Sequence, residues 1–304
     1  MGDCRNGSTA ASSVKGELTS PSLFQLDYLA VPHDLTDYIT TFYHFRCDQP
    51  EIRDIQPADI GHLTLFPCGE GVMEFRDGRS MPSQRVNLLT PFSLAAPFLV
   101  SGPFHALGAV FTPLGWAALT ELCAAEHGNR LYAAKDYLGE EIETIGQDIC
   151  RRYQVGNIGN AEWVEILASF IRANLRQVPD RHRELIRTTT RWLAAALNPS
   201  LDDLYPHLPY SQRQAQRLIE RYFGLPPRAL VRKYRALRAA AWLSLPHLSD
   251  EAEAELAEAF HDQSHLIREL QLFVGRTPAR LGSGSPAYLN EMLDLKNFRE
   301  ITAA

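Results

Sequence analysis

Two short segments near the end of the chain share one plan, and this plan limits the fold more than any other feature of the sequence. YSQRQAQRLIERYFG (210–224) and FHDQSHLIRELQLFVGRTPARL (260–281) each space their apolar residues as one face of a helix, and in each a glycine and then a proline follow that face. The two apolar faces consist of Ala215, Leu218, Ile219, Tyr222 and Phe223, and of Leu266, Leu270, Phe273 and Val274. Each segment also follows a short helical stretch, LDDLYPHL in one case and EAELAEAF in the other. The pattern predicts two helix-turn-helix units.

The outer faces of these segments carry side chains that can read nucleic acid. In the major groove, Arg donates two hydrogen bonds to guanine and Gln pairs with adenine. From Ser211, a good N-cap, to Arg238, eight basic residues stand against one acid, Glu220. This excess indicates a stripe that binds phosphates, and a solvated helix face is the alternative. The predicted phosphate contacts are Ser211, Arg221, Arg228, Arg232 and Lys233.

The stretch SQRQAQRLIERYFGLPPRALVRKYRALRAA, followed by FHDQSHLIRELQLFVGRTPARL, resembles the DNA-binding region of AraC-type (AraC/XylS) transcription regulators. The match covers about residues 185–281, a third of the chain. The resemblance implies double-stranded DNA and RNA polymerase as partners and leaves a homodimer open. It also implies two recognition helices about 34 Å apart, joined by a long helix from Pro227 to Leu243. The base-reading residues that it implies are Arg213, Gln216 and Arg217 in the first unit, and Gln263, Ser264, Ile267 and Arg268 in the second.

Three positions depart from the family pattern. Pro206 lies inside the expected first helix of the first unit, where proline breaks the hydrogen-bond ladder. Pro209 and Ala259 stand where the family commonly has glycine. The approach to the second unit, 250–262, holds six acids and no base, which would repel phosphates. We therefore expect the second unit to bind DNA weakly or to use only its Arg268 end, and a skewed or noncanonical geometry in the first unit is left open.

The first half of the chain has a different pattern of apolar residues. Short alternating runs between Gly and Pro breaks fill residues 23 to about 115 and predict an antiparallel β-barrel or sandwich, and helical spacing follows. The expected fold class is therefore α+β, with a first domain at 23–175, a linker at 176–182 and an all-α domain at 183–281. The resemblance implies that the first is a cupin-like sensor or dimerisation domain and that the all-α domain binds DNA. A disordered arm is expected at 1–22 and a tail at 282–304. The helix face with Trp163 and Phe170 is read as core or as a dimerisation surface. The residues predicted for an effector pocket, each with plain core as the alternative, are Leu65, Phe66, Met73, Phe75, Phe92 and Phe111.

The sequence argues against several other classes. Five scattered cysteines fit no disulfide framework or zinc knuckle, and no apolar run is long enough for a membrane span. A cytoplasmic protein without a membrane partner is expected, bound to the nucleoid through DNA. His44, His62 and His105 lie near predicted strands, but no His-x-His pair exists, and no nucleophile or nucleotide motif appears. The prediction is a regulator that is not an enzyme and needs no cofactor or metal. The alternative is a cupin-like metal-dependent enzyme with an appended DNA-targeting domain.

Overall fold

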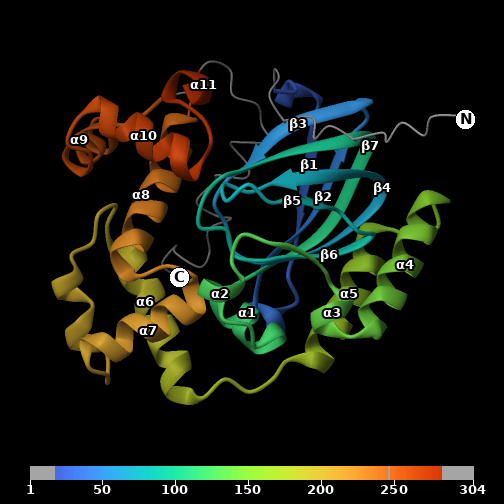
Figure 1. Ribbon diagram of the computed structural model, residues 1–304, viewed down its shortest axis with the longest axis horizontal. Helices are drawn as coiled ribbons and strands as arrows, with labels where there is room; N and C mark the ends of the chain where they lie inside the picture. The colour runs from blue at the N-terminus through green and yellow to red at the C-terminus, as the bar shows by residue number, and fades with distance from the viewer. Residues whose placement is uncertain (1–17, 246, 283–304) are drawn as a thin grey trace, which may run out of the picture.

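The computed structural model describes residues 18–245 and 247–282, and it has the predicted α+β composition. A curved antiparallel sheet with a few helices occupies the first part of the chain, and helices occupy the rest (Figure 1). We call residues 18–174 the sheet part and residues 180–282 the helical part. The predictions for residues 1–17 and 283–304 lie outside the described residues. No helix in the described ranges is both long enough and apolar enough to span a bilayer.

The described residues of the sheet part form one sheet of eight strands in the order β1-β2-β7-β4-β6-β8, with β3 paired to β7 and β5 to β4. The strands are β1 (Gln25–Leu29), β2 (Ile39–Cys47), β3 (Glu51–Gln56), β4 (His62–Glu74), β5 (Ser80–Pro82), β6 (Val86–Leu89), β7 (Ala96–Phe111) and β8 (Leu131–Ala133). All pairs are antiparallel. The two long strands, β4 and β7, pair along most of their length and form the spine of the sheet.

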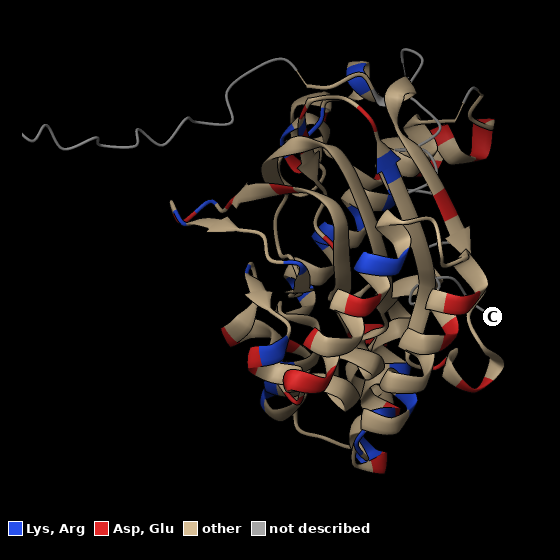
Figure 2. Cartoon of the chain, turned by 90° about the vertical axis from the view of Figure 1, so that its right-hand side faces the viewer, with Lys and Arg blue, Asp and Glu red and all other residues tan. Residues whose placement is uncertain are grey.

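Helices cover one face of this sheet, and further helices form the helical part. In chain order, the α-helices are α1 (Pro113–Thr120), α2 (Ala124–His127), α3 (Lys135–Leu138), α4 (Glu140–Gln154), α5 (Asn160–Asn174), α6 (Asp180–Ala195), α7 (Gln212–Phe223), α8 (Pro227–Leu243), α9 (Asp250–Ala259), α10 (Gln263–Phe273) and α11 (Pro278–Gly282). The helix face with Trp163 and Phe170 on α5 is buried in the core between the sheet and α4, so the core reading of this face is confirmed over a dimerisation surface. Acidic and basic residues are interspersed on the helices in the lower part of the view in Figure 2.

The connection between the two parts lies close to its predicted position. Residues 175–179, between α5 and α6, form no helix, and the predicted linker at 176–182 overlaps them. The predicted arm extends too far, because Thr19 exchanges hydrogen bonds with Arg53 of β3, and Pro21–Leu23 form a 3-10 helix. The connector helix α8 has the bounds that were predicted for it, Pro227–Leu243.

The helix that precedes α7 departs from a regular α-helix, as Pro206 suggested. Two 3-10 turns, Leu201–Asp203 and Tyr205–His207, take its place. Proline lacks the N–H that an α-helix needs at this point, whereas it fits the first turn of the second 3-10 helix. The second unit has a regular first helix, α9, before α10.

The sheet part and the helical part contact each other along three regions. α1 contributes Leu114 and Ala117 to the core of the helical part, and α2 packs against α7. The N–H of Ala58 donates to the carbonyl of Phe273 at 2.7 Å, and that of Ala95 donates to Leu272 at 3.0 Å. The third region is centred on Lys233 of α8. Contacts of this extent hold both candidate helix-turn-helix units against the sheet part.

Candidate nucleic-acid interface and ligand cavity

α7 is a short, well-capped helix with an exposed basic face. The Oγ of Ser211 accepts from the N–H of Gln214 at 3.4 Å, and Gln214 Oε1 accepts from the N–H of Ser211 at 3.2 Å, which forms a capping box. The helix ends at Gly224, whose φ of 79° is in the left-handed region. The Ser211 hydroxyl, a predicted phosphate contact, also donates to Gln214 and is therefore occupied by the cap. The exposed arginines of this helix are Arg213, Arg217 and Arg221.

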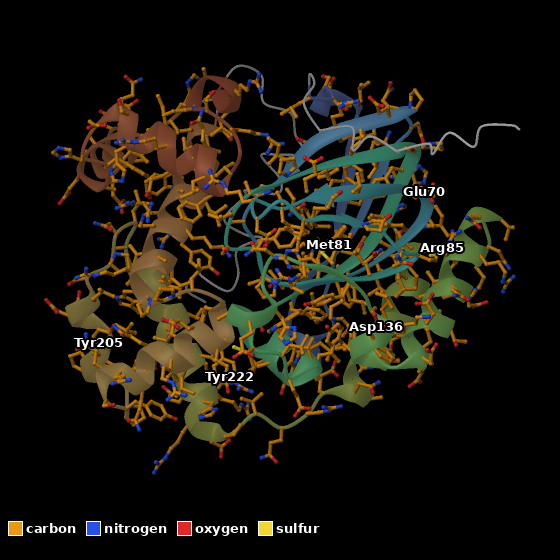
Figure 3. The ribbon with its side chains drawn as sticks, in the orientation of Figure 1. Glu70, Met81, Arg85, Asp136, Tyr205 and Tyr222 are labelled. Carbon is orange, nitrogen blue, oxygen red and sulfur yellow. The ribbon has the colours of Figure 1, made fainter. Side chains whose placement is uncertain are left out.

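The predicted base-reading residues of α7 do not all lie in the same surroundings. Arg213 and Arg217 form no hydrogen bond or ion pair within the described ranges. Arg217 also lines a groove between α7 and α2, opposite Glu126. Gln216 is half-buried, and its Nε2 donates to the Tyr205 hydroxyl at 3.0 Å (Figure 3 labels Tyr205). The amide of Gln216 thus contacts the preceding 3-10 turn, whereas the two arginines are available to a ligand.

α10 repeats the plan of α7 with a different cap. Asp262 accepts from the N–H of His265 at 2.7 Å, and this hydrogen bond is the largest cause that lowers the pKa of the Asp262 carboxyl. A charged carboxylate is therefore favoured at the start of this helix. The Nε of Arg268 donates to the Ser264 carbonyl at 3.2 Å, within the same helix. The predicted base-reading residues that are exposed are Gln263, Ser264 and Arg268, while Ile267 is half-buried.

The prediction of one continuous phosphate-binding stripe is wrong for the basic residues in the middle of α8. Lys233 is 2% exposed, and its Nζ donates to the carbonyls of Asp59 at 2.7 Å and Phe92 at 2.9 Å. Arg238 is buried and donates to the Leu193 carbonyl. These cations hold protein groups, so Lys233 cannot reach a phosphate in this arrangement. Of the predicted phosphate contacts, Ser211, Arg221, Arg228 and Arg232 are exposed.

One buried carboxylate joins α8 to α10. Glu269 is 2% exposed, and its two oxygens accept from Arg232 Nε at 2.7 Å and from Arg235 at 2.9 Å. The Arg235 guanidinium also lies over the Phe260 ring, 4.9 Å from its centroid. Arg232 is half exposed but already carries this ion pair, which weakens the prediction that it binds phosphate. The arrangement fixes α10 on the connector helix.

The helix before α10 is acidic on its surface. Each of the six acids at 250–262 is exposed, and one of them, Glu255, accepts from the N–H of Leu197 at 3.1 Å. Ser249 caps the helix by accepting from the N–H of Ala252 at 3.3 Å. Of these carboxylates, Asp262 lies at the N-terminal end of α10. Their charge opposes phosphate binding at this unit.

The strands of the sheet and Leu237 of α8 line a partly open cavity of about 140 Å³. Two of the residues predicted for a pocket, Phe66 and Met73, line it. Leu65 and Phe111 belong instead to the core under α4 and α5, since neighbouring strand residues point to opposite faces. Phe75 and Phe92 pack on each other with ring centroids 5.5 Å apart, so they too are core residues.

The sequence prediction missed the polar residues of this cavity. His62 and Thr64 alternate with Leu63 and Leu65 along β4, so the polar pair lies on the cavity face. Asp59 lies just before β4 and also lines the cavity, and its Oδ2 is 3.0 Å from His62 Nε2. The alternation in HLTLF was the signal in the sequence that could have identified this face.

Two of the three histidines considered as metal ligands form a different network. The Tyr153 hydroxyl of α4 lies 2.8 Å from both His44 Nε2 and His105 Nδ1, and His105 Nε2 lies 3.0 Å from Asp48. The bonds fit one arrangement, in which His44 donates to Tyr153, Tyr153 donates to His105, and His105 donates to the carboxylate. Burial lowers the pKa of His44 to about 4 and raises that of Tyr153 to about 12. Among the described residues, His, Cys, Asp and Glu form no group of three that could hold a metal ion.

Comparisons with known proteins returned structures but no sequence family. No family model matches the chain, and no curated protein matches it. The chain is similar to ToxT from Vibrio cholerae, with 11% identity over 88% of this chain and 97% of that chain and a TM-score of 0.44. A second structure of ToxT, from Vibrio cholerae O395, gives a TM-score of 0.43 at 11% identity over 90% and 98%. The AraC-like transcriptional activator CuxR gives 0.31 at 12% identity over 72% and 87%.

Proposed function

We propose that the protein is a sequence-specific DNA-binding transcription regulator of the AraC type. The observation that carries this proposal is the pair of capped helices α7 and α10, each with exposed Arg side chains, both held on α8. α7 directly precedes α8, and α10 packs against the middle of α8 through Glu269. Two helices held on one connector helix can enter neighbouring segments of one major groove. RNA polymerase is the partner through which such a protein would change transcription, and a homodimer would bind two half-sites.

The two helices are expected to contribute unequally. Arg213 and Arg217 on α7 form no hydrogen bond or ion pair with residues 18–245 and 247–282, and Arg228 on α8 is exposed. Arg268 on α10 has the acidic helix α9 as its neighbour. We therefore infer that the first unit supplies most of the affinity and that the second adds base selectivity.

The proposal is tested with DNA selected from a random pool by the purified full-length protein. Arg217→Ala should weaken binding to the selected site by about 1–3 kcal/mol and relax base preference at one position. Arg228→Ala is the matched control on a predicted phosphate contact. It should weaken binding to all sequences alike and reduce the slope of log affinity against log salt by about 0.9. Arg268→Ala should have a smaller effect than Arg217→Ala.

A pool from which no sequence is enriched would contradict the proposal. So would an Arg217→Ala variant that keeps both its affinity and its base preference. We further propose that the cavity in the sheet part binds a small effector, because its lining is largely apolar and includes Leu237 of α8.

A further inference from the structure

The three amide side chains in the first part of α7 have different surroundings. Gln214 Oε1 accepts from the N–H and from the hydroxyl of Ser211, at 3.2 and 2.9 Å, so this amide belongs to the helix cap. Gln216 Nε2 donates to the Tyr205 hydroxyl at 3.0 Å. The Gln212 side chain forms no hydrogen bond with the residues that the structure describes. Two of the three amides are therefore held by groups of the first unit itself.

Gln216 shares a face of α7 with the two arginines that are available to a ligand. It follows Arg213 by three positions, a spacing that places two side chains next to each other on a helix, and it directly precedes Arg217. Both arginines are exposed, and neither forms a hydrogen bond or ion pair within the described ranges, whereas Gln216 is half-buried. A duplex that contacts the two arginines would therefore also lie next to Gln216.

The Tyr205 hydroxyl has a fixed place beside α7. The Tyr205 side chain is half-buried and packs against the core of the helical part. Tyr205 begins the 3-10 helix that contains Pro206, and its carbonyl accepts from the N–H of Leu208 at 3.1 Å (Figure 3). Packing of the ring and closure of the turn thus both hold the hydroxyl where Gln216 reaches it.

The hydrogen bond to Tyr205 competes with the pairing of Gln216 with a base. Glutamine recognises adenine through two bonds in the major groove, in which Nε2 donates to N7 and Oε1 accepts from the N6 amino group. The Nε2 that this pairing needs is the atom that donates to Tyr205. A neutral hydrogen bond inside a protein changes an equilibrium about two- to tenfold, so adenine recognition by Gln216 is weakened by this factor. The arginines lose no bond to the described residues when they donate to guanine.

We propose that Tyr205 is a positioning residue that sets the base preference of the first unit, because its hydroxyl holds Gln216 on the 3-10 turn. α7 then selects guanines through Arg213 and Arg217, and its preference for adenine through Gln216 is reduced. Residues four apart on an α-helix are about 6 Å apart along its axis, and base steps are about 3.4 Å, so the two guanines lie within about two steps of each other. This role of Tyr205 rests on the proposed function, because it concerns the bases that the same helix reads.

The first experiment compares the DNA that full-length wild type and Tyr205→Phe select from a random pool. The substitution keeps the packed ring and removes the hydroxyl, so Gln216 loses its partner. At one position beside the selected guanines, the variant should prefer adenine over the other bases about two- to tenfold more strongly than the wild type does. Fluorescence anisotropy with duplexes that differ only at that base gives the same ratio from dissociation constants. Equal base preferences of the two proteins at every position overturn the proposal.

Gln216→Ala shows whether the gained preference comes from this amide. The substitution should lower the preference for adenine about two- to tenfold more in the Tyr205→Phe background than in the wild type, because only the free amide pairs without losing a bond. A purely structural role of Tyr205 would weaken binding to all sequences alike and would leave no such difference. An effect of Gln216→Ala that is equal in both backgrounds, or a gained preference that persists in the double variant, overturns the proposal.

Tyr210→Phe is the matched control. Tyr210 is half-buried like Tyr205 and directly precedes the cap of α7, but its hydroxyl forms no hydrogen bond with the residues that the structure describes. Its preference for adenine should stay within about twofold of that of the wild type, which is below the range of one hydrogen bond. A shift toward adenine as large as that of Tyr205→Phe would overturn the proposal, because the contact with Gln216 would then not be its cause. Circular dichroism checks that all variants are folded.

The selection separates the role of Tyr205 from the proposed function. A wild type that enriches a sequence while Tyr205→Phe prefers the same bases contradicts only the role of Tyr205. A selected site in which the base that depends on Arg217 is not guanine also contradicts the proposal made here for α7. A wild type that enriches no sequence contradicts the proposed function, and the role of Tyr205 fails with it.

Discussion

The ion pair between Arg276 and Asp54 gives a direct test of how the two parts of the molecule are held together. Asp54 is 2% exposed and Arg276 is 6% exposed, and they come from β3 and from the segment after α10. The Arg276 guanidinium also donates to the Ile55 carbonyl at 3.1 Å, and Asp54 accepts from the N–H of Ile55 at 2.8 Å. Removal of one partner from a buried pair leaves an uncompensated charge and costs about 3–5 kcal/mol.

The perturbation is a double-mutant cycle with Arg276→Met and Asp54→Asn. Each single substitution should lower the free energy of unfolding by about 3 kcal/mol or more. The double variant should be destabilised by less than the sum of the two, because it leaves no lone charge. Urea unfolding followed by fluorescence and by circular dichroism provides the free energies, and proteolysis within 175–179 reports whether the parts have separated.

The pH dependence of the Arg276→Met variant tests the same pair independently. Burial is the largest cause that raises the pKa of Asp54, and Arg276 opposes it. Without Arg276 the carboxyl is favoured in its protonated form in the folded state, so stability is present at low pH and is lost as pH rises through the raised pKa. The deficit of the variant relative to the wild type should thus be smaller near about pH 5 than near about pH 8. Single variants within about 1 kcal/mol of the wild type, or a deficit that does not change with pH, would refute a buried, charged pair.

Two further predictions concern His44 and the glycine after α10. Burial lowers the pKa of His44 from its ordinary 6.5 to about 4, so the unfolded chain binds a proton that the folded protein excludes. The free energy of unfolding should be retained above pH 6.5 and fall by roughly 3 kcal/mol as the pH drops toward 4. In urea unfolding, the free energy of the His44→Gln variant should depend less steeply on pH than that of the wild type. An unchanged slope would exclude His44 as the cause. Gly275 has a φ of 77°, and a Cβ there would overlap Ile55 of the sheet part, whereas Gly139 has a φ of 86° with open space around it. In thermal unfolding Gly139→Ala should cost about 1 kcal/mol and Gly275→Ala at least about twice that; equal costs would mean that Ile55 moves aside easily.

The helices of the candidate interface could be predicted from the sequence because their signals are local. An apolar residue every three or four positions, a capping residue at the start and a glycine at the end define α7 without reference to the rest of the chain. Ser211 and Gly224 occupy these positions, and the structure places the helix between them. The bounds of α8, by contrast, were expected from the family resemblance, and the structure places the helix at the same residues, Pro227–Leu243.

The role of each cation could not be predicted, because that role depends on what packs against the helix. Arg228 and Lys233 lie on one helix, yet the first is exposed and the second is covered by the segment before β4 and by the loop after β6. No residue near Lys233 in the sequence indicates that its Nζ will donate to the carbonyls of Asp59 and Phe92. The same limit applies to Leu65 and Phe66, which are adjacent on β4. Because successive side chains point to opposite faces of the sheet, Leu65 lies in the core and Phe66 lines the cavity.

The net charge of −6 is therefore a poor guide to what the helical part can bind. Among the described residues of the helical part, the four buried cations Lys233, Arg235, Arg238 and Arg276 are occupied by protein groups and add little to the field outside. Exposed charges act over about 8–10 Å in physiological salt, so a duplex at α7 would sense chiefly the arginines of that helix and Arg228. A duplex at α10 would sense the carboxylates of α9 as well as Arg268. The local balance favours the first unit, and it leaves the second unit able to discriminate between sequences without supplying much of the affinity.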